Sequence, residues 1–125
     1  YVRISRTVEI GEGTIICAGN ILTVNIKIGE HVGLHVNCNT GHDTIIDDFA
    51  TILPGSNIAG HVHIGEGCFI GTGASIINDL EIGRWTTIGA GAVVIEDIPS
   101  YSVAVGVPAR VVKRKDIEDG GGGAK

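Results

Sequence analysis

Aliphatic side chains recur at every sixth position along most of the chain. From residue 4 onward, fifteen of sixteen such positions are isoleucine, leucine or valine, and only Thr40 departs. The positions are Ile4, Ile10, Ile16, Leu22, Ile28, Leu34, Thr40, Ile46, Ile52, Ile58, Ile64, Ile70, Ile76, Ile82, Ile88 and Val94. No insertion shifts the phase. A period of six does not fit a helix, so the pattern predicts short strands separated by regular turns.

Two further positions of the hexad carry their own residue types. Glycine often follows the aliphatic residue, where a tight corner suits it best; these glycines are Gly11, Gly29, Gly41, Gly65, Gly71, Gly83 and Gly89. Four places after the aliphatic residue stands a mostly small or β-branched one: Val8, Thr14, Val32, Cys38, Thr44, Ala50, Ser56, Val62, Cys68, Ala74, Thr86 and Ala92. Each hexad is therefore expected to form one short strand and one turn.

A strict period of six with these residue classes resembles the hexapeptide-repeat left-handed parallel β-helix, in which three hexads form one triangular coil of 18 residues. The resemblance implies an all-β, single-stranded solenoid over residues 1–98. An irregular C-terminal cap is expected over 99–115, and a flexible tail over 116–125. The handedness comes from the resemblance alone, because parallel crossovers are usually right-handed. Each coil would pair its backbone with the coils above and below, around an aliphatic interior.

Composition narrows the class of protein. The chain has 125 residues, 43% of them hydrophobic, which is room for one domain with a real core. A formal net charge of −5 argues against a nucleic-acid surface, and no apolar stretch approaches the roughly 20 residues that cross a bilayer. Three cysteines without a secretory leader predict reduced thiols and a cytoplasmic protein. The absence of methionine and the glycine-rich end suggest an excised or engineered domain.

The one break in the aliphatic repeat, Thr40, stands in the segment Thr40-Gly41-His42-Asp43. In a repeat protein, a break in the pattern is a candidate for chemistry. The residues alone leave two interpretations open. Thr40 is either a packing variant beside a solvated histidine, or it marks a site at which His42 acts.

A longer motif favours the second interpretation. Gly41-His42-Asp43-Thr44-Ile45-Ile46-Asp47-Asp48-Phe49, followed by Pro54-Gly55 and Ala59-Gly60, resembles the His-acid signature of the sialic acid O-acetyltransferase family. That family includes the bacterial UDP-4-amino-sugar N-acetyltransferases. Later segments at 70–74, 88–94 and 106–109 also match, so the likeness spans roughly Ile28 to Arg114. It implies direct transfer of acetyl from acetyl-CoA to a sugar amine or hydroxyl.

The resemblance assigns roles at the centre of the site. His42 would take the proton from the attacking group, and Asp43 would orient its imidazole. Neighbouring residues of a strand point to opposite faces, so Asp43 reaches His42 only if the chain turns there. Gly41 would permit that turn, and Asp47 or Asp48 is the alternative partner.

Contacts with the coenzyme carry over to Thr51, Gly60, Thr72 and Ala90. Gly60 lies 18 residues after His42, so it is expected one coil above the base, where its backbone could meet a thioester carbonyl. Thr51 departs from the family, which commonly has a second histidine there. Threonine still donates one hydrogen bond.

Partners and rival functions complete the predictions. The family implies a homotrimer with active sites between prisms. It also implies an N-terminal nucleotide-binding domain that this sequence does not show. The expected acceptors are, in order, a UDP-linked 4-amino sugar, a sialic acid hydroxyl and a small non-sugar amine.

One alternative function is that of an inert or engineered trimer scaffold. The other is a zinc enzyme like γ-class carbonic anhydrase, but its histidine pair five residues apart is missing, so no metal ligand is assigned.

Overall fold

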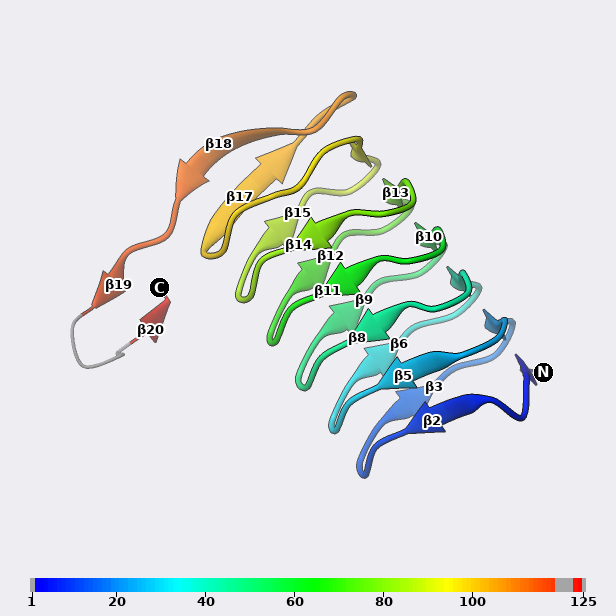
Figure 1. The fold of residues 1–125 in the computed structure, drawn as a ribbon. Helices are drawn as coiled ribbons and strands as arrows, with labels where there is room; N and C mark the ends of the chain where they lie inside the picture. Colours follow the sequence, from blue (N-terminus) through cyan, green and yellow to red (C-terminus); the bar gives the residue numbers. More distant parts are fainter. Residues whose placement is uncertain (1, 119–122, 125) are drawn as a thin grey trace.

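The computed structural model describes residues 2–118 and 123–124, and in this part of the chain all regular elements are strands. They stack in successive coils along one axis, with the cap over the C-terminal end (Figure 1). Three sheets form the sides of the prism, and the strands contributed by successive coils are parallel in each. Within the described residues, no helix is long and apolar enough to span a membrane.

Consecutive strands go to the three sheets in turn. Sheet A contains β1 (Arg3–Ile4), β4 (Ile21–Leu22), β7 (Asn39–Thr40), β10 (Asn57–Ile58), β13 (Ser75–Ile76) and β16 (Val93–Val94). Sheet B contains β2 (Val8–Ile10), β5 (Ile26–Ile28), β8 (Ile45–Ile46), β11 (His63–Ile64) and β14 (Glu81–Ile82). Sheet C contains β3 (Ile15–Ile16), β6 (Gly33–Leu34), β9 (Thr51–Ile52), β12 (Phe69–Ile70), β15 (Thr87–Ile88), β17 (Ser102–Val105) and β18 (Arg110–Arg114). The predicted left-handed parallel β-helix is confirmed.

The register follows the hexad. Asn39 pairs with Asn57 and Asn57 with Ser75, so equivalent residues 18 apart lie side by side. The last coil is shorter, because Ile98 pairs with Ile82 at a spacing of 16 residues. The coil after Val94 is thus two residues shorter than the others. This shortening ends the six-residue period of the sequence, but the stacking of strands continues.

The aliphatic column fills the interior as predicted. Its members from Leu22 onward are at most 3% exposed, whereas Ile4 and Ile10 in the first coil are 43% and 41% exposed. The second inward column is buried with it from Val32 onward, and its hydroxyl groups find partners. Thr44, for example, donates to the carbonyl of Ala59 at 3.0 Å. Branched side chains of moderate size therefore fill the narrow core without aromatic rings.

Thr40 is the exception inside this core. Its side chain is 1% exposed, and its hydroxyl has no hydrogen-bond partner among the described residues. A buried hydroxyl without a partner costs free energy. Thr40 thus faces the interior, while His42 two residues later is exposed on the outside. The break in the repeat and the candidate base are neighbours in sequence but do not share a surface.

The cap over 99–115 is more regular than expected. β17 extends sheet C parallel to β15, and β18 returns antiparallel to β17 with one irregularity between Val103 and Ala104. Lys115 links the end of β18 to the prism. Its Nζ donates to the carbonyl of Trp85 at 2.7 Å and to Oγ1 of Thr87 at 2.9 Å. Burial lowers the pKa of Lys115.

In the expected tail, β19 (Ile117–Glu118) pairs antiparallel with β20 (Gly123–Ala124). Residues 119–122 and 125 of that tail lie outside the described residues. Its flexibility therefore stays a prediction.

Candidate active site

The candidate site lies on the edge of the prism between sheets A and B. The turn 41–43 connects β7 to β8, and the turn 59–61 connects β10 to β11 one coil further along. The backbone amide of His61 donates to the carbonyl of His42 at 2.8 Å, which locks the two turns together. The hexad register therefore brings residues 42 and 43 next to residues 60 and 61.

Asp43 reaches His42 because the chain turns between them. Asp43 has a φ of 58°, in the left-handed region that aspartate tolerates better than most residues. Its Oδ2 lies 3.0 Å from Nδ1 of His42. The alternative partners are engaged elsewhere: Asp47 contacts Nε2 of His63 at 2.8 Å, and Asp48 accepts from the amide of Glu30 at 2.8 Å. The geometry selects Asp43.

Electrostatics at the pair agree with this arrangement. The hydrogen bond from His42 is the main cause that lowers the pKa of Asp43, and Asn25 and the charge of His61 act in the same direction. A carboxylate that accepts from Nδ1 holds the proton on that nitrogen, so the lone pair of Nε2 is left to accept another proton. The His42 and Asp43 side chains are 55% and 39% exposed, so a substrate can reach them.

Gly60 stands directly against the imidazole of His42. A Cβ built at Gly60 would lie 2.5 Å from Nε2 and 2.8 Å from both Cδ2 and Cε1. These distances are shorter than side chains tolerate, so any larger residue at position 60 would displace the His42 ring from this position. The expectation that Gly60 stacks one coil above His42 is confirmed as geometry.

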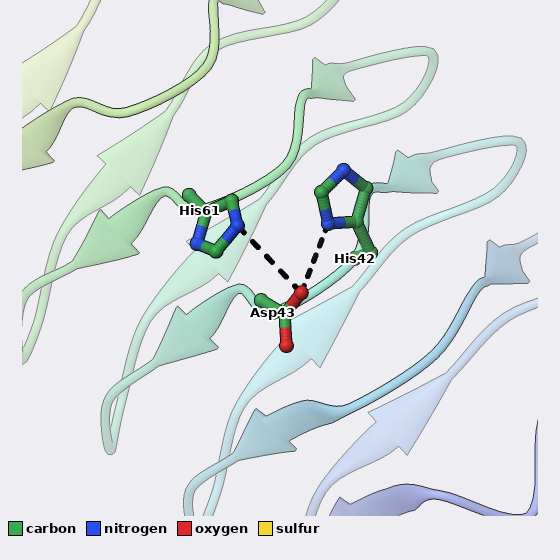
Figure 2. A group of neighbouring side chains, drawn as sticks. All are labelled: His42, Asp43 and His61. Carbon is green, nitrogen blue, oxygen red and sulfur yellow. Dashed lines mark hydrogen bonds and ion pairs between the residues drawn. The ribbon is translucent and has the colours of Figure 1, made fainter.

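His61 is a member of this cluster that the sequence analysis missed. Its Nε2 lies 3.7 Å from Oδ2 of Asp43, and its ring meets His42 edge to face at 5.1 Å (Figure 2). The signal was available, because His61 follows Asp43 by one coil of 18 residues, as Gly60 follows His42.

The remaining predicted coenzyme residues lie elsewhere on the same protomer. Thr51 is on β9 in sheet C. Thr72 and Ala90 are in turns between sheets C and A, stacked one coil apart, where the amide of Gly91 donates to the carbonyl of Thr72 at 2.8 Å. One protomer thus places Thr51 on a face of the prism, and Thr72 and Ala90 on a different edge from His42. Only Gly60 accompanies His42.

Other candidate residues have structural partners. His63 lies on sheet B between Asp47 and Glu81, and His31 stacks on Phe49 with centroids 5.6 Å apart. The basic run 110–115 is partly used by the cap: Lys115 binds the prism as described, and Arg114 donates to the carbonyl of Ser100 at 3.3 Å.

Comparisons with known proteins agree with this picture. A family profile described as "Bacterial transferase hexapeptide (six repeats)" matches residues 61–96. No curated protein sequence matches the chain. Among solved structures, a mutant perosamine N-acetyltransferase from Caulobacter crescentus, in complex with CoA and GDP-perosamine, is 33% identical with a TM-score of 0.89. That match covers 90% of this chain and 53% of the other.

Two further relatives are similar in extent. The acetyltransferase domain of PglB from Neisseria gonorrhoeae FA1090, in complex with acetyl coenzyme A, is 32% identical over 89% of this chain and 54% of its own, with a TM-score of 0.88. WeeI from Acinetobacter baumannii AYE is 38% identical over 89% of this chain and 54% of its own, with a TM-score of 0.83. The predicted resemblance to hexapeptide-repeat acetyltransferases is confirmed. The chain spans about half the length of these relatives.

Proposed function

We propose that this chain is the catalytic β-helix of an acetyl-CoA-dependent acetyltransferase that acts on a sugar, with His42 as general base. The observation that carries the proposal is the placement of the His42 ring. Its Nδ1 is held by Asp43 at 3.0 Å, and its Nε2 faces Gly60 on an exposed edge. The likeness to proteins crystallised with CoA or acetyl coenzyme A supports the same reaction.

In the proposed reaction, the acceptor nitrogen or oxygen attacks the thioester carbonyl while Nε2 of His42 takes its proton. Asp43 stabilises the imidazolium that forms, because it accepts from Nδ1. When the C–S bond breaks, the proton passes from His42 to the departing thiolate, and coenzyme A leaves as the thiol. No acyl-enzyme is needed. The carbonyl of Gly60 accepts from the backbone amide of Asp79 at 3.1 Å. The amide of Gly60 is the proposed donor to the thioester carbonyl oxygen.

The coenzyme site is proposed to need a second protomer. Thr51, Thr72 and Ala90 lie away from the edge that carries His42, so they could complete its site only from a neighbouring prism. Phe69, which pairs with Thr51 on sheet C, is 44% exposed and offers apolar contact area there. Contact between two different surfaces is heterologous, and such contacts form a ring when the rotation between neighbouring protomers closes. A homotrimer is the proposed ring.

The proposed acceptor is a nucleotide-linked amino sugar. The likeness to a perosamine N-acetyltransferase bound to GDP-perosamine supports an amine on a nucleotide sugar, and a UDP-linked 4-amino sugar remains the first candidate. Thr51, where the family commonly has histidine, would hold the acetyl oxygen by one hydrogen bond. The cytoplasm is the proposed location.

The test is release of thiol from acetyl-CoA with a panel of nucleotide amino sugars, for the parent and for His42→Ala. Loss of the base should lower turnover by about 100-fold or more. His63→Ala is the matched control, since His63 also contacts a carboxylate but lies on sheet B. Equal turnover in the parent and His42→Ala would remove His42 from the mechanism. Light scattering should report the mass of three chains.

A further inference from the structure

Three ligand atoms converge at the edge between sheets A and B. Nδ1 of His42 and Nε2 of His61 approach the same oxygen of Asp43, Oδ2, from two sides (Figure 2). The distances to that oxygen are 3.0 Å and 3.7 Å. Ligand atoms of all three residues lie within 4.8 Å of one another, and all three side chains are exposed.

The two separations that involve Asp43 are those of a zinc site. Zinc binds imidazole nitrogen and carboxylate oxygen at about 2.0–2.2 Å, so two ligand atoms of a tetrahedral site are about 3.3 Å apart. The two distances in the structure bracket that value. The geometry points to a zinc-binding site formed by His42, Asp43 and His61, with the fourth position open to solvent, that inhibits the enzyme when it is filled.

The backbone holds this arrangement before any ion arrives. Asp43 and His61 occupy equivalent turn positions one coil apart, with φ of 58° and 57°. The amide of Asp43 donates to the carbonyl of Val24 at 3.0 Å, and that of His61 to the carbonyl of His42 at 2.8 Å. An ion therefore has to reorient side chains only, because the coil register already supplies the spacing.

His63 also lies between two carboxylates, but its nitrogens do not converge with them on one point. His63 contacts Asp47 through Nε2 at 2.8 Å and Glu81 through Nδ1 at 3.6 Å. The two nitrogens point away from each other across the ring, so one ion cannot bind His63 together with both carboxylates. Convergence on one point distinguishes the 42–43–61 cluster from this pair.

Inhibition follows from the chemistry of the imidazole and rests on the proposed function. Zinc on Nδ1 of His42 requires the ring proton to reside on Nε2, and it takes Asp43 away from that ring. Nε2 then donates and can no longer accept the proton of the acceptor. Zinc binding does not depend on the role of His42 as general base, so binding and inhibition are measured separately.

The experiment titrates the metal-free, untagged full chain with zinc sulfate at neutral pH by calorimetry. One site per chain is expected. His61→Asn should weaken binding by at least about 10-fold, because loss of outer-shell partners alone costs that much. His63→Asn should bind as the parent does. In the thiol-release assay, zinc should inhibit the parent at the concentrations that saturate the calorimetric site, and His61→Asn only at concentrations at least about 10-fold higher.

The results separate the two proposals. Absence of stoichiometric binding in the parent, or equal affinity in His61→Asn and the parent, overturns the zinc site. Zinc that binds through His61 without slowing turnover overturns the inhibition. A chain that binds zinc in this way but transfers no acetyl to any acceptor of the panel leaves the site standing and counts against the proposed function.

Discussion

Gly60→Ala is the most direct test of the geometry around His42. The added Cβ would lie 2.5 Å from Nε2 of His42, whereas ordinary contact begins at 3.4 Å. It would also meet Cδ2 and Cε1, so a rotation about the ring axis does not relieve the overlap. The ring has to move away from the edge, and with it goes the hydrogen bond to Asp43.

The displacement sets the size of the effect. Moving the ring by about 1 Å is enough to cost about 100-fold in rate when a reacting group is misplaced. Stability should change little, since the His42 side chain is 55% exposed and free to move, and the replacement of glycine by alanine also lowers the entropy of the unfolded chain. We expect kcat to fall with an unchanged midpoint of urea denaturation.

Gly33→Ala is the matched control. Its Cβ would meet only Nε2 of His35 at 3.9 Å, which is ordinary contact. Both variants are compared with the parent by thiol release, on the acceptor that the panel identifies, and by urea denaturation. The reasoning is refuted if Gly60→Ala turns over as fast as the parent, or if Gly60→Ala is much less stable to urea than Gly33→Ala.

Two further predictions concern the interior. Thr40→Val replaces a buried hydroxyl without a partner by a methyl group and should raise the free energy of unfolding by about 1 kcal/mol; Thr44→Val, which removes a hydrogen bond, should lower it, and urea denaturation of both reports the sign. Burial raises the pKa of Cys68 to about 11 from 9.0. The stability linked to this neutral thiol is therefore complete below pH 9 and is lost as the pH rises to about 11. The melting temperature should fall over that range, and less steeply in Cys68→Ala; equal slopes would exclude Cys68 as the cause.

Much of the molecule could be predicted from the period of six. The aliphatic residues at that spacing define which side chains enter the interior, and the unbroken phase makes residues 18 apart neighbours. Gly60 beside His42 follows from that arithmetic alone. The cap does not, because the two-residue shortening before Ile98 and the antiparallel return of β18 depend on which backbone groups remain to be paired.

The sequence by itself determined the fold and the partner stacked on the base. The tertiary structure decided the chemistry of the edge. Whether Asp43 or a later aspartate holds His42 depends on a left-handed turn residue that the hexad pattern does not reveal. The role of His61 depends on the direction in which two imidazole rings point. Period fixes which residues are neighbours, but side-chain direction requires the three-dimensional path of the turns.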